Sequence, residues 1–457
     1  MVERLHRRSG IAASSAPLPL RCPLPFLQRI RAIREYHTGQ IPVRDAGGPV
    51  TAAMWGPAAP MVVFATSPAA IHDVLGRSDA FIEKGIVHRE MRWLMGDNLF
   101  DLPHEPWLPR RRAVQPLFTK RHVRGFAGEM VGAADAVAGE WGDGAVVDLD
   151  AQCRRLTLRA LSRSILGLDI DDRADRIGEN MRIANGYVAD RALRPVRAPR
   201  VVPTPARARA RAAVASTLGL AGEVVAASRN NPDGAAPLVR ALMEAADPQT
   251  GRTLTDEEIC AELLVFIGAG YDTTATTLAY TLWELGRNPE IQAAVRAEVD
   301  ALGGRPPTPD DLPALTFTVQ VLHEALRLCP PAPAVGREAV QEVLVGGFRI
   351  PRGTILIAGT YAVHRDPALW DDPLTFVPDR FRPDRMRSLD RWQYLPFGAG
   401  PRSCVGDHFA MLEATLALAG IVRAVAVESV RPDFPTAVPF TMVAAAPVPA
   451  RVRRRAA

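Results

Sequence analysis

Apolar residues recur at intervals of three and four along most of the chain, which is the pattern of helices that bury one face. The longest such run begins at Thr255, and Glu258 stands where a capping box places its glutamate. The run stays apolar on almost every face until Asn288-Pro289, where the proline stops a helix. About 32 residues at roughly 1.5 Å each give about 48 Å. The sequence therefore predicts one long helix at the centre of the molecule.

Strand-like stretches are short. Strands are predicted at 50–55, 61–65, 342–345 and 355–357, and a helix capped by Ser67 is predicted through Leu75. Residues 47–72 carry no charge and are long enough to raise the question of a membrane span. Glycines and prolines interrupt them, so two strands joined by a turn are predicted, with no integral membrane segment. Residues 439–447 predict a hairpin whose tip lines a pocket.

The fold class that follows is mainly α with a small β-rich region. The 457 residues show no linker that would divide two cores, so 1–25 is predicted to be a disordered basic tail and 26–457 a single domain. Prolines and arginines interrupt the helical pattern at 194–205, which predicts a mobile surface loop. The N-terminus lacks a convincing signal peptide.

Composition narrows the class of protein. Hydrophobic residues make up 47% and charged residues 23%, as in soluble globular proteins. The net charge of +5 comes without aromatic residues interleaved among the basic ones, which favours a solvated surface or an acidic protein partner over nucleic acid. The five cysteines are scattered without Cys-x-x-Cys spacing, which argues against disulfides and zinc and for a reducing, cytoplasmic location.

One cysteine stands apart from the others because of its surroundings. Cys404 lies in a loop of Gly, Ala and Pro residues directly before an apolar helical run, and Arg402 adds a cation two residues away. A helix N-terminus and a nearby cation both favour the thiolate, and Gly406 lets backbone approach closely. A thiolate presented in this way suits an axial ligand of haem iron. The alternative is a buried, inert cysteine.

The middle of the long predicted helix breaks local rules. Gly270 is a poor helix former, and Asp272 is a lone acid in an apolar run, followed by Thr273. One interpretation is a close helix crossing with hydroxyl groups bonded to preceding carbonyls. The other is a widened turn over an iron, where Asp272 and Thr273 relay protons and the small Ala269 leaves room for dioxygen.

Three further groups of charged residues are candidates. Glu324 and Arg327 share a helix face, which by itself indicates only a surface ion pair. A loop with Arg380 follows downstream. Trp107 and Arg111 are four apart, so they share a helix face, and the alternative there is a basic surface helix.

Together these motifs resemble those of the cytochrome P-450 family over about residues 25–455. The resemblance rests on Phe-x-x-Gly-x-Arg-x-Cys-x-Gly from Phe397 to Gly406, continued as Ala410-x-x-Glu413, and on Ala/Gly-Gly-x-Asp-Thr-Thr, Glu-x-x-Arg and Pro-x-x-Phe-x-Pro-x-Arg-Phe. It implies a triangular prism that encloses haem b between the long central helix and the helix after the cysteine. Pro109 departs from the pattern, since proline suits only the first turn of a helix.

The resemblance also implies roles for the candidates. Cys404 would bind the iron, Asp272 and Thr273 would supply protons, and Glu324, Arg327 and Arg380 would form a charged triad behind the haem. The residues expected to contact the cofactor are Trp107, Arg111, Ala269, Arg337, Phe397, Arg402 and Gly406. The segment 194–205 would belong to a lid over the substrate entrance.

The function implied is a haem–thiolate monooxygenase that hydroxylates or epoxidises an apolar lipid, terpene or polyketide. Electrons would come from a separate ferredoxin- or flavodoxin-type donor with its reductase, docking on Arg110, Arg111 and Arg112, and the enzyme would be a monomer. The pocket candidates are Phe81, Ile86, Met95, Phe266, Ala269, Val335 and Met442. The alternatives are a peroxide-driven oxygenase, a coupling or rearrangement enzyme, and a non-catalytic haem sensor.

Overall fold

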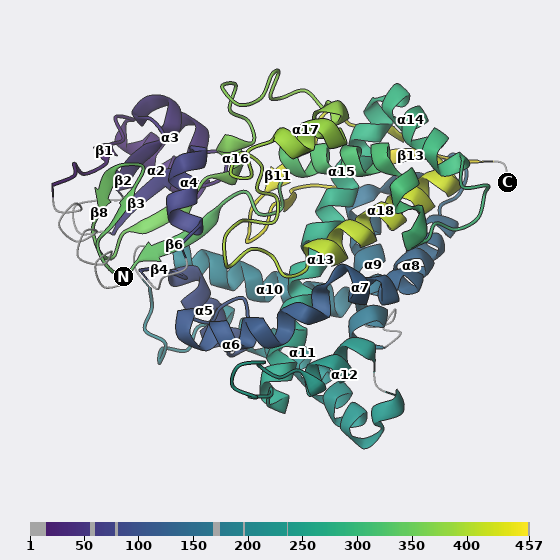
Figure 1. Cartoon of the computed structure of the whole chain (residues 1–457), viewed down its shortest axis with the longest axis horizontal. Helices are drawn as coiled ribbons and strands as arrows, with labels where there is room; N and C mark the ends of the chain where they lie inside the picture. The colour runs from purple at the N-terminus through teal and green to yellow at the C-terminus, as the bar shows by residue number, and fades with distance from the viewer. Residues whose placement is uncertain are drawn as a thin grey trace.

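A computed structural model describes residues 15–54, 60–77, 81–167, 174–194, 197–234 and 236–455. Helices form most of the molecule, and the main sheet lies at one end of it (Figure 1). The longer helices are α2 (Phe26–Arg34), α3 (Gln40–Gly47), α4 (Pro68–Leu75), α5 (Ile86–Met95), α6 (His104–Val114), α8 (Ala127–Gly139), α9 (Leu149–Leu161), α10 (Ala174–Leu193), α11 (Pro205–Asn230), α12 (Pro237–Glu244), α13 (Asp256–Arg287), α14 (Pro289–Asp300), α15 (Thr316–Leu328) and α18 (Asp407–Ala424). Short helices are α7 (Lys120–Val123), α16 (Thr360–Val363) and α17 (Pro383–Ser388). The mainly α fold class is confirmed.

The central helix is α13, as the sequence predicts. Its N-cap Thr255 accepts a hydrogen bond from the Glu258 backbone while the Glu258 side chain bonds back, so the capping box is present. The helix contacts α9, α11, α15 and α18, and its N-terminal and C-terminal halves belong to two different large apolar clusters of the core. Because neighbouring helices cover α13 on most sides, the helix needs no polar face toward solvent.

The main sheet has the strand order β1-β2-β3-β9-β6-β4. Its strands are β1 (Leu20–Arg21), β2 (Val50–Met54), β3 (Met61–Ala65), β4 (Ile82–Glu83), β6 (Val335–Ala339) and β9 (Ile355–Ala358). β2 and β3 pair antiparallel, which confirms the predicted strand pair, and Ser67 caps α4 as expected. Trp55, the predicted end of the first strand, lies outside the described residues.

Smaller sheets complete the β-rich part. β10 (Val425–Ser429), β13 (Pro449–Arg454) and β5 (Val146–Asp148) form one sheet, while β7 (Val343–Val345) pairs with β8 (Phe348–Ile350), and β11 (Thr436–Ala437) with β12 (Val443–Ala444). The last pair is the expected C-terminal hairpin, and Phe440 and Thr441 at its tip line a cavity.

The predicted tail of residues 1–25 is wrong for residues 15–25. β1 pairs with β2, the backbone amide of Cys22 donates to the Ala52 carbonyl, and the Cys22 side chain is buried in an apolar cluster. Residues 1–14 lie outside the described part of the chain. Within that part, one helix, α11, is long and apolar enough to cross a membrane by length and composition, and it packs against α10 and α13.

Candidate active site

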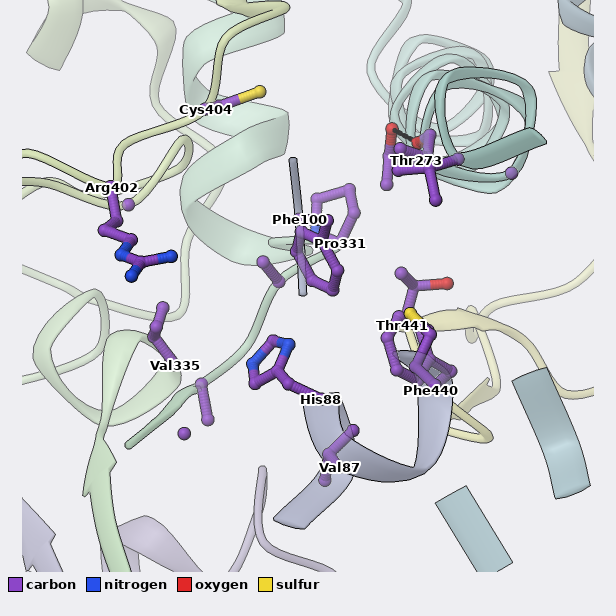
Figure 2. A pocket seen from close by; sticks show the side chains of 18 of the residues that line it. Val87, His88, Phe100, Thr273, Pro331, Val335, Arg402, Cys404, Phe440 and Thr441 are labelled. Carbon is purple, nitrogen blue, oxygen red and sulfur yellow. Dashed lines mark hydrogen bonds between the residues drawn. The ribbon is translucent and has the colours of Figure 1, made fainter. Parts of the chain in front are cut away.

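A cavity of about 800 Å³ lies between the middle of α13 and the loop that precedes α18 (Figure 2). Ala269 and Thr273 of α13 line it, and so do Phe397, Cys404 and Gly406 of the loop. The tertiary fold therefore brings together two motifs that are far apart in the sequence.

Backbone geometry fixes the cysteine loop. Gly398 and Gly400 have φ angles of 66° and 74°, and a Cβ on Gly400 would lie 1.9 Å from the Leu75 carbonyl oxygen. Glycine is required at residue 400 because both the conformation and the close approach exclude a side chain. The amide of Cys404 donates to the Phe397 carbonyl at 2.9 Å, which closes the turn and leaves the sulfur facing the cavity.

Cys404 is exposed, and it lines the cavity. The protein atoms around the sulfur desolvate the thiol and raise its pKa to about 11, while the Gly406 amide, 3.3 Å from Sγ, and the Arg111 guanidinium oppose that shift. The chain by itself therefore favours the thiol, and a cation bound at the sulfur is needed for the thiolate. Arg402, expected to assist, instead donates to the Leu102 carbonyl at 2.6 Å.

Cations line one edge of the cavity. Arg111, Arg337 and Arg402 converge there with Lys84, and the Arg402 guanidinium lies 4.2 Å from the centre of the Trp107 ring. Burial lowers the pKa of Arg337 to about 10, and the charge of Arg402 adds to the shift. Buried cations in this excess require an anionic partner. The edge thus fits the two propionates of a haem b. No motif in the sequence indicated that Lys84 would join these arginines.

The middle of α13 is a regular α-helix, so the predicted widened turn is wrong. Thr273 Oγ1 donates to the Ala269 carbonyl at 2.7 Å, and a Cβ on Gly270 would lie 2.9 Å from the Leu161 side chain. The close helix crossing therefore describes this segment better. A π-helical turn occurs instead at Ser162–Leu166, directly after α9.

Asp272 does not meet Thr273 at the cavity. Its carboxylate forms a buried ion pair with Arg154 of α9, whose guanidinium also bonds Asp150 at 2.7 Å. Asp272 is absent from the cavity wall, whereas Thr273 and Thr274 belong to it. Burial raises the pKa of Asp272, and the Arg154 charge opposes the shift.

Glu413 of α18, the last residue of the motif that begins at Phe397, is a buried acid. Both carboxyl oxygens are inaccessible to solvent, and its neighbours Ala410 and Ala414 line the cavity. Burial raises its pKa to about 8, and the hydroxyl of Thr274 opposes that shift. A protonated carboxyl therefore stands directly behind the cavity wall at neutral pH.

The scaffold residues come together in the core, which makes the surface ion pair wrong. Arg327 and Glu324 are fully buried and joined by two hydrogen bonds of 2.7 and 2.8 Å, and Arg380 reaches Glu324 at 3.3 Å. Arg327 also donates to the carbonyls of His364, Pro373 and Thr375. One guanidinium thus ties α15 to the segment that precedes the cysteine loop.

The basic run on α6 is not a docking surface. Arg110 is buried and paired with Glu258 and with Glu262, the latter at 2.6 Å. Arg112 is held by Asp247 through two hydrogen bonds. The acidic partners come from segments far along the chain, so the sequence could not show that the charges of Arg110 and Arg112 are neutralised.

Arg111 faces the cavity and donates to the Ser403 carbonyl at 3.0 Å. α6 also continues through Pro109, beyond its first turn. The expectation that proline is tolerated only in the first turn is therefore wrong here.

The expected mobile loop at 194–205 is extensively bonded in its described part. Arg207 is buried, donates to the carbonyls of Pro199 and Arg200 at 3.0 and 2.6 Å, and bonds the Tyr187 hydroxyl at 3.0 Å. Glu90 of α5 pairs with Arg191 of α10 at 2.8 Å and with Arg200 of the segment at 3.5 Å. These contacts fasten the segment to α5, whose inner face lines the cavity.

The pocket candidates divide into two groups. Ile86, Met95, Phe266 and Val335 line the cavity together with Ala269, as predicted. Phe81 and Met442 do not: Phe81 packs beside the main sheet, and the buried Met442 sulfur lies 3.6 Å from the Cys329 sulfur. Phe100 and His88 line the cavity and were not anticipated, whereas Phe440 lies at the tip of the predicted hairpin.

Comparisons with known proteins agree with this geometry. The family model described as Cytochrome P450 matches residues 16–453. Cyclooctat-9-en-7-ol 5-monooxygenase of Streptomyces melanosporofaciens is 33% identical over 78% of each chain. Pentalenene oxygenase of Streptomyces avermitilis is 32% identical over 77% of this chain and 78% of its own.

A solved structure supports the fold match. The heme domain of cytochrome P450DA superposes with a TM-score of 0.82 at 27% identity, covering 96% of this chain and 97% of that one. A mutant of the same heme domain gives a TM-score of 0.84 at 28% identity, covering 96% of this chain and 98% of that one.

Proposed function

The chain belongs to the cytochrome P450 family of haem monooxygenases, and from this premise we propose that it hydroxylates or epoxidises a terpenoid. The observation that carries the proposal is the apolar cavity between Cys404 and Thr273 (Figure 2). Its volume of about 800 Å³ includes the space that haem fills when bound, and the rest of its lining is mainly apolar, as in small-molecule sites. The names of relatives that act on cyclooctatin and pentalenene skeletons support the substrate class.

The cofactor in this proposal is haem b, which supplies the oxygen activation when bound. Cys404 would hold its iron, and Arg337, Arg402, Arg111 and Lys84 would pair with its propionates. Ala269 and Thr273 of α13 line the part of the same cavity where substrate and dioxygen would have to fit. The apolar wall keeps bulk water from that space, which favours reaction with substrate over release of reduced oxygen species.

Proton delivery is the task we propose for Thr273 and Asp272. Thr273 lines the cavity, and its hydroxyl group donates its hydrogen bond to the Ala269 carbonyl. The hydroxyl oxygen can therefore accept a hydrogen bond from a water molecule or an acid in the cavity. Asp272 reaches this position only by leaving Arg154. The relay in our proposal therefore includes a rotation of Asp272 during turnover.

A specific observation favours a second candidate, a peroxide-driven oxygenase. Such an enzyme needs no proton relay from Asp272, and the ion pair with Arg154 holds that carboxylate away from the cavity. The two candidates differ in their oxidant and share the substrate site.

The electron donor we propose is a ferredoxin- or flavodoxin-type protein, and the chain would act as a cytoplasmic monomer. Exposed basic residues Lys120 and Arg121 follow α6 on α7, which packs against α18, the helix after the cysteine loop. This basic segment replaces Arg110 and Arg112 as the surface for an acidic partner.

The test uses the purified holoenzyme. A reduced carbon monoxide complex with the red-shifted band of thiolate ligation is expected, followed by oxygenation of a terpene hydrocarbon or alcohol with NADH, a surrogate ferredoxin and its reductase. Turnover with hydrogen peroxide but not with the electron donors assigns the second candidate. Absence of the thiolate band refutes both.

A further inference from the structure

One corner of the apolar cavity is polar. His88 of α5 projects into it beside Phe100, with the two ring centres 4.9 Å apart (Figure 2). The residue is only 8% exposed. Val87 and Phe440 line the cavity close by, and Lys84 and Thr441 are the other polar side chains of this part of the lining. Buried polar groups of this kind are normally paired.

A chain of hydrogen bonds fixes the orientation of the imidazole. His88 Nδ1 lies 3.1 Å from Asp101 Oδ1, and the Asn98 amide donates to the other carboxyl oxygen of Asp101 at 3.0 Å. Asp101 is itself buried and its backbone amide is held by Asn98. Nδ1 is therefore committed, and among the described residues Nε2 has no protein partner, which leaves it for a ligand in the cavity.

The protonation state of His88 limits what this ligand is. Burial lowers the pKa of His88 well below its usual value, and Lys84, Arg337, Arg402 and Arg89 add to the shift. The ring is neutral, so Nε2 either accepts or donates one hydrogen bond, depending on the tautomer. A hydroxyl group satisfies both tautomers, a carbonyl satisfies only one, and a hydrocarbon leaves the nitrogen desolvated and unpaired.

We propose that His88 hydrogen-bonds a hydroxyl group of the substrate and so selects a terpenoid alcohol over the parent hydrocarbon, with Asp101 as the positioning residue. The inference rests on the proposed function, because it names the substrate class of the same cavity. An alcohol substrate implies that an earlier reaction supplies the oxygen, either another oxygenation or capture of water at the end of a carbocation cyclisation.

The experiment titrates the holoenzyme with two sets of rigid terpenoids and follows the shift of the Soret band. The first set is the hydrocarbon bornane, the alcohol borneol and the ketone camphor; the second is the hydrocarbon cedrane and the alcohol cedrol. Each alcohol should bind the wild type about three- to tenfold more tightly than its hydrocarbon, the range expected for one buried hydrogen bond. His88→Phe should reduce this ratio to about one and leave the hydrocarbon affinity within about twofold.

Three further variants separate binding from folding. His88→Gln retains a polar terminus and should restore part of the preference for alcohol. Asp101→Asn keeps the shape of the positioning residue and should give an intermediate ratio. His72→Gln changes a histidine exposed on α4 and should match the wild type in every titration. Haem content and the reduced carbon monoxide spectrum are measured on all of them.

The outcomes distinguish the two proposals. Equal binding of alcohol and hydrocarbon by the wild type, or an unchanged ratio in His88→Phe, overturns the role of His88 while leaving a terpenoid monooxygenase intact. Loss of haem from His88→Phe with the ratio preserved also overturns it, because the ring would then serve the cofactor. If none of the five compounds shifts the spectrum, the terpenoid substrate class itself is wrong, and the role of His88 falls with it.

Discussion

Replacing Arg327 with leucine removes the side chain that holds the segment before the cysteine loop. Glu324 would lose two short hydrogen bonds and the charge that compensates its own, at a site with no solvent exposure. Breaking a buried pair in this way costs about 3–5 kcal/mol. The orphaned carbonyls of His364, Pro373 and Thr375 add about 1–3 kcal/mol each where no water reaches them.

The sum is comparable to the whole stability of a typical domain, about 5–15 kcal/mol. Arg327→Leu should therefore give little soluble holoenzyme, and any that folds should melt more than about 10 °C below the wild type. Arg327→Lys keeps the charge but not the fork of donors, so it should lie between the two. The measurements are soluble yield, haem per chain and thermal unfolding by circular dichroism.

A matched control is the exposed pair of Arg31 and Glu35, also on one helix face, where Arg31→Ala should change stability by less than about 0.5 kcal/mol. Glu324→Leu combined with Arg327→Leu should recover part of the loss, because the fully buried Glu324 carboxylate is no longer left without Arg327, while the remaining deficit reflects Arg380, which also loses Glu324 as its partner. The reasoning is refuted if Arg327→Leu folds with normal haem content and melts within about 2 °C of the wild type.

Four other substitutions test separate parts of the site. Thr273→Ala should divert most reducing equivalents to hydrogen peroxide, measured as peroxide formed per NADH consumed. An unchanged ratio of product to NADH contradicts the proposed proton relay. Asp272→Asn should slow turnover in H₂O and enlarge the solvent isotope effect. The folded protein holds the proton of Glu413 up to about pH 8, while the unfolded chain releases it near its ordinary pKa of 4.5, so this group makes stability fall as pH rises between those values. Glu413→Gln should remove that fall, and parallel melting-temperature curves for both proteins across this range contradict it. Arg207→Ala should loosen residues 194–205, which Arg207 holds through backbone carbonyls. If this segment covers the substrate entrance, the rate of substrate binding in stopped-flow should rise, and the spectrum of the bound state should not change.

Much of the fold was accessible from local sequence. The capping box at Thr255 and the proline at residue 289 define both ends of α13, because cap and stop signals act within one helical turn. The glycine spacing before Cys404 likewise reports a loop conformation that few other residues adopt. β1 was missed because two residues in a proline-rich segment carry no periodic pattern, and only pairing with β2 makes them a strand.

The charged residues show where sequence reasoning stops. Arg110 and Arg112 look like free surface cations, yet Glu262 and Asp247 neutralise them from segments far along the chain. Asp272 looks like one half of an acid–alcohol pair, but α9 offers it Arg154. An ion pair depends on which helix faces which, and the pattern along a single helix does not contain that information.

The sequence by itself determined the elements, the cysteine loop and the family, because capping, turn chemistry and fixed motif spacing are short-range properties. Only the tertiary structure decided which charges are paired, that Lys84 joins the cationic edge of the cavity, and that His88 and Glu413 lie beside it. Burial and long-range contacts set the protonation and the free hydrogen-bonding capacity of a side chain, and both arise when distant segments pack together.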